Sequence, residues 1–313
     1  MEGTIYDAAG GAYRLPVLLS WDVSHGFCSP CDSFTVTFLY DKTMLPPLEA
    51  ACRFSAEHGR EAVFCGVVDE FELSADSGGC LCTLHGRGLQ ALLLDSEAES
   101  AEYYNATTEY ILSRHVRPLG VTEVAPGALG GRSASLSVSS GESHWSVLRR
   151  FAEFCLGVQP RFTPAGTLLL DGADSGRSFT VDGGTPVTAQ TYGQDRYGVI
   201  SEAIVKNRVR GPRVTVDNPA FQEIGGSCSR VINVPRMTGF DAMRHTGAYQ
   251  IAQSEADFIR CRLTLPALFA AFPGDRAVLN ATPLGITGEF TVRASRCFAD
   301  GKRAGTVLDL RKP

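Results

Sequence analysis

The sequence predicts a β-rich α+β protein in which antiparallel β-structure lies on both sides of a smaller α/β region. Three observations support this prediction. Residues 33–41 ("SFTVTFLYD") alternate apolar and polar side chains with the period of two expected for a half-buried strand. Glycine-containing turns at 76–79 ("DSGG") and 299–302 ("ADGK") separate similar segments near both ends of the chain. Two helical patterns with start and stop signals lie between residues 105 and 157.

Length and charge limit the class of protein. A chain of 313 residues is long enough for two or three domains, because single cores stop growing at roughly 250–300 residues. Its 34 acidic and 29 basic side chains are interspersed, with no basic block for nucleic acid or an anionic membrane. No leader pattern opens the chain, and no apolar run approaches the ~20 residues that span a bilayer. We therefore expect a protein that folds in the cytoplasm without membrane contact.

The predicted first domain, residues 1–96, is a series of antiparallel strands. Besides the strand at 33–41, residues 61–74 form a long strand that turns and returns as residues 80–86. Strands joined by short glycine turns are typical of a small sandwich or barrel.

The predicted middle domain, residues 97–190, is an α/β module with two helices. The first helix has Asn105 as its cap and stops before Gly120. The second is capped by Ser143 and ends at Gly157, with apolar residues at helical spacing between them.

Short strands complete the middle domain and lead into the last one. They are expected at 159–172 and 177–184. The predicted third domain, residues 191–313, is again β-rich, with one helix over 241–256 that Gly247 weakens by about 1 kcal/mol relative to alanine. Its strands are expected at 198–209, 257–266, 275–281 and 288–311.

The chain contains ten cysteines, an even number that is compatible with a disulfide framework. Most of them lie inside apolar strand or helix patterns: Cys65, Cys80, Cys82, Cys155, Cys261 and Cys297. Because a free cysteine behaves as a small buried hydrophobe, we predict reduced core thiols rather than disulfides.

One cysteine pair has the spacing of a metal or redox half-site. Cys28 and Cys31 form "CSPC", with His25 close by. A structural zinc ion needs four ligands, and the next pair, Cys80 and Cys82, has the spacing of a strand. We therefore predict loop thiols between two strands and no metal site.

Two groups of polar residues are candidates for catalysis. Ser143 and His144 are adjacent, but no G-x-S-x-G elbow surrounds them, so Ser143 is interpreted as a helix cap. Asp69, Glu70 and Glu72 are candidates for the paired acids of a glycoside hydrolase. Because Glu70 and Glu72 alternate with apolar residues, a solvated strand face explains them more simply.

The remaining candidates carry less chemistry. The segments "DGGTP" and "EIGGSCS" lack the lysine and the following helix of a phosphate loop. The other histidines are scattered singly: His58, His85, His115 and His245. No catalytic, cofactor-binding or metal-binding residue is therefore predicted, and no cofactor.

The order of these segments resembles a known family. "VFCGVVDEFELS" (63–74), "CTLHGRGLQALLLDSE" (82–97) and "NATTEYILSRHVRPLGV" (105–121) are similar to the hub proteins of phage tail baseplates. That group includes the late control gene D proteins and the hub half of type VI secretion spike proteins. The family often has aspartate where this chain has Gly88, a structural position.

The resemblance extends over nearly the whole chain. Residues 144–170 resemble the family's second helix and following hairpin, and 192–207 the strand that enters its second barrel. Residues 272–310 resemble its closing strands. Each motif consists mainly of core and turn residues, so the order of the modules carries the resemblance.

The resemblance implies two tube-type antiparallel β-barrels that flank the α/β module, and a homotrimer with six barrels in a ring. Such a structural hub adapts a hexameric tail tube to a trimeric central spike, and it needs no active site. The implied partners are tail tube or distal tail protein rings and a separate spike polypeptide, with the tape measure protein as a further candidate. The implied location is the virion tail baseplate, assembled in the bacterial host cytoplasm. The resemblance is the same for phages, phage-derived bacteriocins and secretion machines, and for contractile and long flexible tails.

DNA would pass through the ring without specific binding, and the acidic balance of the chain suits such a lumen. Unchanged DNA ejection after charge reversal of the lumen acids would contradict this hypothesis. Two alternatives remain open: another β-rich baseplate, adaptor or binding protein, and a peptidoglycan hydrolase that depends on Glu70 or Glu72. Oligomeric state separates the hub from the binding protein, and cell-wall clearing identifies the hydrolase.

Overall fold

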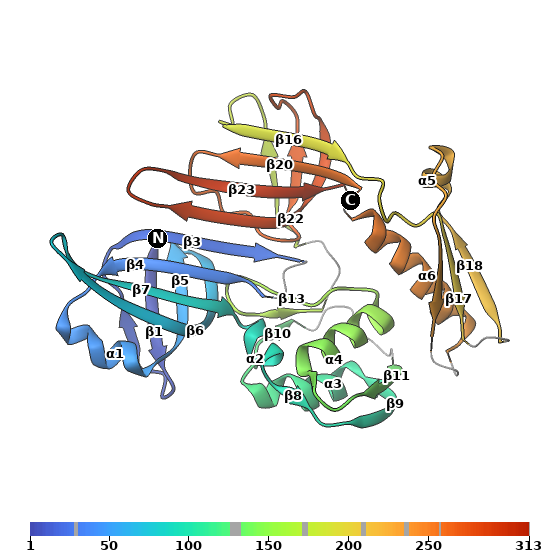
Figure 1. Ribbon diagram of the computed structural model, residues 1–313, viewed down its shortest axis with the longest axis horizontal. Coiled ribbons are helices and arrows are strands. Elements are labelled where there is room, and N and C mark those ends of the chain that lie inside the picture. Colours follow the sequence, from blue (N-terminus) through green and yellow to red (C-terminus); the bar gives the residue numbers. More distant parts are fainter. Residues whose placement is uncertain are drawn as a thin grey trace.

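The computed structural model describes residues 1–27, 31–125, 133–170, 175–207, 211–234, 238–256 and 258–312. It confirms the β-rich α+β class, with two antiparallel β-units, one before and one after an α/β module along the chain (Figure 1). Among the described residues, no helix is both long and apolar enough to cross a membrane. The predicted domain boundaries near residues 96 and 190 stay predictions.

The N-terminal β-unit, blue in Figure 1, contains seven strands and a short helical segment. The strands are β1 (Glu2–Asp7), β2 (Ala12–Arg14), β3 (Leu18–Gly26), β4 (Ser33–Leu39), β5 (Ala51–His58), β6 (Glu61–Asp76) and β7 (Gly79–Gly88), and the helices are η1 (Lys42–Met44) and α1 (Leu45–Ala50). The sheet order is β3-β4-β7-β6-β5-β1-β2.

Aromatic side chains fill the core of this unit. Phe34 and Phe54 stack with ring centroids 4.1 Å apart, and Phe64 lies beside both. The sheet needs glycine at position 86, because a Cβ there would lie 2.0 Å from the Val67 carbonyl oxygen and 2.4 Å from the Phe34 ring. The predicted hairpin at 61–86 is confirmed as β6 and β7.

The α/β module, green in Figure 1, follows through α2 (Gln90–Leu94). Its other elements are β8 (Glu97–Ala98), β9 (Ala101–Thr107), α3 (Thr108–His115), η2 (Arg117–Leu119), β10 (Val124–Ala125), β11 (Ser133–Val138), β12 (Glu142–Ser143), α4 (His144–Phe151), the π-helical turn η3 (Ala152–Leu156), β13 (Arg161–Phe162) and β14 (Leu168–Leu169). A single hydrophobic cluster that includes Trp145 and Phe151 joins the helices to these strands.

One predicted helix cap is confirmed and one is wrong. The Ser143 hydroxyl accepts a hydrogen bond from the Ser146 amide, and Gly157 ends the helical segment with a φ of 70°. Asn105 does not cap α3, because it lies inside β9 with a φ of 54°. The cap is Thr107, whose hydroxyl accepts from the Tyr110 amide, so the helix begins two residues later than predicted.

The C-terminal β-unit, at the top of Figure 1, contains β15 (Ser178–Val181), β16 (Ala189–Gln194), β20 (Ile259–Leu265), β21 (Arg276–Leu279), β22 (Gly288–Ala299) and β23 (Ala304–Arg311). Four of its strands follow the order β16-β20-β23-β22, and β21 lies on the other side of β22. β15, which the sequence places in the middle domain, pairs parallel with β21 and so joins this sheet.

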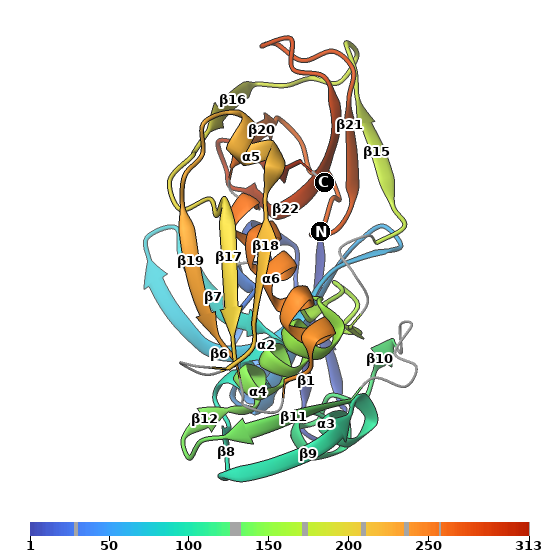
Figure 2. The same cartoon turned by 90° about the vertical axis from the view of Figure 1, so that its right-hand side faces the viewer.

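A small α/β insert lies between β16 and β20. It contains β17 (Glu202–Lys206), β18 (Arg213–Asp217), α5 (Pro219–Glu223), β19 (Ser229–Asn233) and α6 (Phe240–Glu255). Figure 2 shows the three strands side by side with α6 against them. The predicted helix at 241–256 is confirmed, and Gly247 has a packing reason, because a Cβ there would lie 2.7 Å from Val216 Cγ2.

The cysteines follow the prediction in part. Cys82, Cys261 and Cys297 are buried free thiols, and Cys65 is a half-buried one. Burial raises the pKa of the Cys82 thiol to about 11, which keeps it protonated. The prediction is wrong for Cys80, which is exposed because the tip of the β6–β7 hairpin extends beyond the core.

Candidate assembly surfaces

The two β-units are joined into one continuous sheet. β22 pairs antiparallel with β3 through six residue pairs, from Ala294 opposite Gly26 to Ala299 opposite Trp21. Eight strands therefore follow one another in the order β16-β20-β23-β22-β3-β4-β7-β6, and every neighbouring pair is antiparallel (Figure 1). Strands that are distant in the sequence thus form one central sheet.

The eight strands consist of two similar groups of four. In the C-terminal group, β22 is the last strand in the order given above. It forms a hairpin with β23 and pairs on its other side with β21. In the N-terminal group, β6 has the same place relative to β7 and β5. Figure 1 shows that the tips of both hairpins point to the same side of the molecule. The sheet is therefore an internal repeat, although no sequence repeat reveals it.

Each end of the eight-strand run has an open edge. β5 covers β6 only as far as Val67, so residues 68–76 pair with β7 alone among the described strands. At the other end, β16 pairs only with β20 within the described chain. Unpaired edges present rows of N–H and C=O groups that can pair with another chain. Leu73 and Tyr192, on these two edges, are 37% and 38% exposed.

One face of the sheet is polar, while the other covers the hydrophobic cores. Serine and threonine side chains from β3, β4 and β7 lie on the polar face, and some bond across strands, such as Thr37 to Thr83 at 3.3 Å. Most arginines on this face are paired with carboxylates. Arg262 bonds to Asp309 across β20 and β23, and Arg296 bonds to Asp22 across the β22–β3 junction.

These ion pairs neutralise the paired arginines of the face. Hydrogen bonds that the guanidinium groups donate to these carboxylates raise the pKa of Arg262 and Arg296 above the ordinary value for arginine. Arg87 bonds to both Asp69 and Asp95, and this contact lowers the pKa of the Asp95 carboxyl. Exposed pairs of this kind add little stability, typically about 0–1 kcal/mol each. Their main effect is that the guanidinium groups are already occupied by carboxylates.

A buried polar cluster supports the sheet beside the β22–β3 junction. The imidazole of His25 lies between the Asp32 carboxylate, 3.2 Å from Nδ1, and the Val63 carbonyl, 2.9 Å from Nε2. Asp32 also accepts from the Gly26 amide at 3.1 Å and from the Gln90 side chain at 3.3 Å. His25 is thus a structural residue that connects β3, β6 and α2. Cys28, the other half of the "CSPC" pair, lies outside the described residues.

A second histidine cluster lies in the α/β module, where the sequence suggested only isolated residues. His115 Nδ1 is 2.9 Å from His144 Nδ1, and the Tyr103 hydroxyl is 3.0 Å from His115 Nε2. Burial, with the charges of His144 and Arg114 nearby, lowers the pKa of His115 to about 4. Burial likewise lowers the pKa of His144. Both rings are therefore neutral at pH 7.

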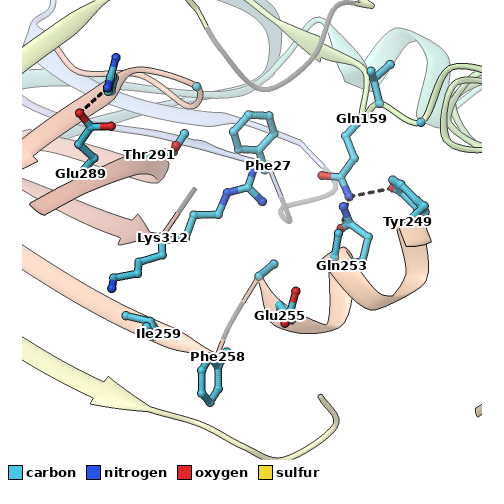
Figure 3. Close-up of a pocket in the computed structure, with 17 residues that line it drawn as sticks. Phe27, Gln159, Tyr249, Gln253, Glu255, Phe258, Ile259, Glu289, Thr291 and Lys312 are labelled. Carbon is cyan, nitrogen blue, oxygen red and sulfur yellow. Dashed lines mark hydrogen bonds and ion pairs between the residues drawn. The ribbon is translucent and has the colours of Figure 1, made fainter. Parts of the chain in front are cut away.

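A cavity of about 770 Å³ opens where the module, the insert and the C-terminal β-unit meet (Figure 3). Gln159 bonds to Gln253 at 2.8 Å on one wall, next to Tyr249 of α6. On the opposite wall Glu289 is paired with Arg276. The drawn side chains present no nucleophile beside a base, so the cavity is interpreted as a junction between modules.

The other residues considered for catalysis are either exposed on a strand face or bonded to neighbouring side chains. Glu70 and Glu72 are exposed on the strand face of β6, as predicted. Asp69 is bound by Arg87, and His85 Nδ1 is 3.0 Å from the Thr35 hydroxyl. Among the described residues, no group of three or more His, Cys, Asp or Glu side chains could hold a metal ion.

No protein-family model and no curated protein sequence matches the chain. Solved structures do. The tail protein of Neisseria meningitidis MC58 aligns with a TM-score of 0.79 at 17% identity, over 99% of this chain and 96% of that one. The 43 kDa tail protein of prophage MuSo2 from Shewanella oneidensis aligns with a TM-score of 0.78 at 18% identity, over 100% and 99% of the two chains. The fold is that of phage tail proteins.

A secretion protein shares the fold at a greater distance. The c3393 protein of Escherichia coli, a type VI secretion component described as similar to the T4 bacteriophage tail proteins gp27 and gp5, aligns with a TM-score of 0.60. Its identity is 12%, over 95% of this chain and 73% of that one. The fold expected from the hub resemblance is thereby confirmed.

Proposed function

We propose that this chain is a structural baseplate hub of a phage tail or a phage-like injection machine. Three copies form a ring that adapts a hexameric tail tube to a trimeric central spike. The partners are tail tube or distal tail rings, a separate spike and, as a further candidate, the tape measure protein. The fold shared with tail proteins and with a type VI secretion component supports this assignment by analogy.

The observation that carries the proposal is the eight-strand antiparallel run with an open edge at each end. Because the number of strands is even, the first strand of one copy runs antiparallel to the last strand of the next. Copies can therefore join edge to edge without breaking the alternation, and a closed ring covers both open edges of this run. Three copies supply six similar four-stranded groups.

The polar face is proposed to line the channel, because the hydrophobic cores cover the opposite face. Sticking to DNA requires cations that can exchange their counterions for phosphates. The ion pairs of Arg262 and Arg296 leave these guanidiniums occupied, which suits a surface past which DNA slides. This mechanism depends on paired charges rather than on the acidic balance of the whole chain.

Light scattering on the purified chain tests the proposal. A hub should give three times the chain mass of 33.6 kDa, and an electron-microscopy image should show a ring with a central hole. A species that remains at the chain mass at every concentration would contradict it. We assign no catalytic role, and clearing of cell-wall material by the purified protein would overturn that part.

A further inference from the structure

We propose that the open edges of β6 and β16 pair with each other between neighbouring copies, in the register that β22 and β3 already show within the chain. This inference rests on the proposed trimer and names its seam residue by residue. The occupant of each open edge is thus a second copy of this chain. The argument starts from the internal repeat.

The last strands of the two groups, β22 and β6, correspond position by position. β22 has a register shift between Val292 and Ala294, and β6 has one between Val68 and Glu70. On the far side, the last covered residue is Thr291 in β22 and Val67 in β6. The bulges therefore lie at the same place, and residues 70–75 of β6 correspond to residues 294–299 of β22.

The strands on the other side of the seam correspond in the same way. In the N-terminal group, one row of facing residues crosses the four strands from β3 to β6. It consists of Asp22, Thr35, His85 and Glu70. In the C-terminal group, the corresponding row crosses from β16 to β22. It consists of Thr191, Arg262, Asp309 and Ala294. Position 191 is therefore the equivalent of position 22.

Transfer of the internal register gives the seam. Within the chain Cys297 lies opposite Val23, and Phe298 opposite Asp22. The equivalent pairs between copies are Leu73 with Tyr192 and Ser74 with Thr191. At the ends of the seam, Ala75 faces Gln190 and Glu70 faces Asp195.

The burial of these positions supports the pairing. Cys297 and Val23 are 5% and 1% exposed, because each covers the other at the internal junction. Their equivalents Leu73 and Tyr192 are 37% and 38% exposed in the single chain. Two apolar side chains that face each other across neighbouring strands stabilise a sheet. The seam thus covers apolar surface that a single chain leaves in water.

The charges on the polar face are complementary at Glu72, whereas Glu70 at the end of the seam faces Asp195, a carboxylate of like charge. β6 presents Glu70 and Glu72, both exposed, while β20 presents Arg260 and Arg262 one strand inside the β16 edge. Each of these arginines already bonds to one carboxylate of its own chain, Asp195 and Asp309, so Glu72 would be a second acceptor for them. Glu72 comes opposite Gly193, which has no side chain to separate it from the arginines. The internal junction has a similar contact with opposite charges. There Arg296, the equivalent of Glu72, reaches diagonally across the junction and bonds to Asp22.

Cysteine cross-linking tests the register on the full chain. In the Ser74→Cys/Thr191→Cys variant, a mild oxidant such as oxidised glutathione accepts two electrons and two protons as the facing thiols form a disulfide. The expected product is a covalent trimer that reduction returns to monomer. The matched control, Ser74→Cys/Ala189→Cys, lies on the same face two residues out of register and should remain unlinked. The single variants and the natural chain control for the native cysteines.

The outcomes separate the seam from the hub assignment. A trimer by light scattering that links through the control pair, or through neither pair, overturns the register and leaves the proposed function intact. A chain that stays monomeric overturns both. As an independent check, Tyr192→Asp should raise the concentration below which trimers dissociate by at least about tenfold. Because the trimer dissociation constant scales with the square of that concentration, this is about 2.8 kcal/mol per trimer. Unchanged trimer stability in that variant would contradict the seam.

Discussion

Replacement of Asp32 by asparagine tests whether the buried polar cluster stabilises the N-terminal β-unit. Asp32 is 8% exposed, and its carboxylate accepts from the Gly26 amide, the His25 ring and the Gln90 side chain. Asparagine keeps the shape but has only one acceptor oxygen. At least one of the three buried donors therefore loses its acceptor, and the remaining bonds lose the charge of the carboxylate.

The magnitude follows from these contacts. A buried donor without an acceptor costs about 1–3 kcal/mol, and charge-assisted hydrogen bonds are roughly twice as strong as neutral ones. We therefore expect Asp32→Asn to lower the free energy of unfolding by about 3 kcal/mol. That change corresponds to a fall of about 12–24 °C in the melting temperature of the N-terminal unit, measured by differential scanning calorimetry.

The matched control is Asp22→Asn on the polar face. Asp22 also accepts several hydrogen bonds, all from Arg296, but its side chain is 36% exposed, so water can replace them. The expected loss is below about 1 kcal/mol. Equal losses for the two variants would refute the reasoning, because burial would then not decide the cost of removing a carboxylate.

Two further predictions concern other regions. Since the folded-state pKa of His115 is about 4 while the unfolded value is about 6.5, the unfolded state binds more protons between these values. Stability is thus complete above about pH 6.5 and falls by about 3 kcal/mol toward pH 4, a loss that His115→Gln should reduce in urea titrations. Gly247→Ala should destabilise the insert by about 1–2 kcal/mol, although alanine favours helices, because its Cβ meets Val216. A pH-independent natural chain, or a more stable Gly247→Ala variant, would contradict the respective prediction.

Local sequence signals predicted the local structure well. The alternation in residues 33–41 predicted β4, and Ser143 with Gly157 predicted the limits of a helical segment, because capping and side-chain period depend on neighbouring residues. Where a local signal failed, as at Asn105, pairing with β11 extended the strand past the expected cap.

The histidine cluster of His115 and His144 shows a second limit of sequence reasoning. The two residues are far apart in the chain, and neither has a local pattern that indicates a partner. Packing of α3 against α4 brings their rings to 2.9 Å. The shift in the pKa of His115 is therefore a property of the packed module rather than of the sequence around it.

By itself, the sequence determined the types of element, their order, and which face of each strand is apolar. The period of two in a strand specifies that face, but it does not specify the neighbouring strand. Only the tertiary structure decided that β22 lies beside β3, about 270 residues away in the chain, and that β16 and β6 are left as open edges. Backbone hydrogen bonds are the same for every residue type except proline, so shape and packing of the whole chain select the partner.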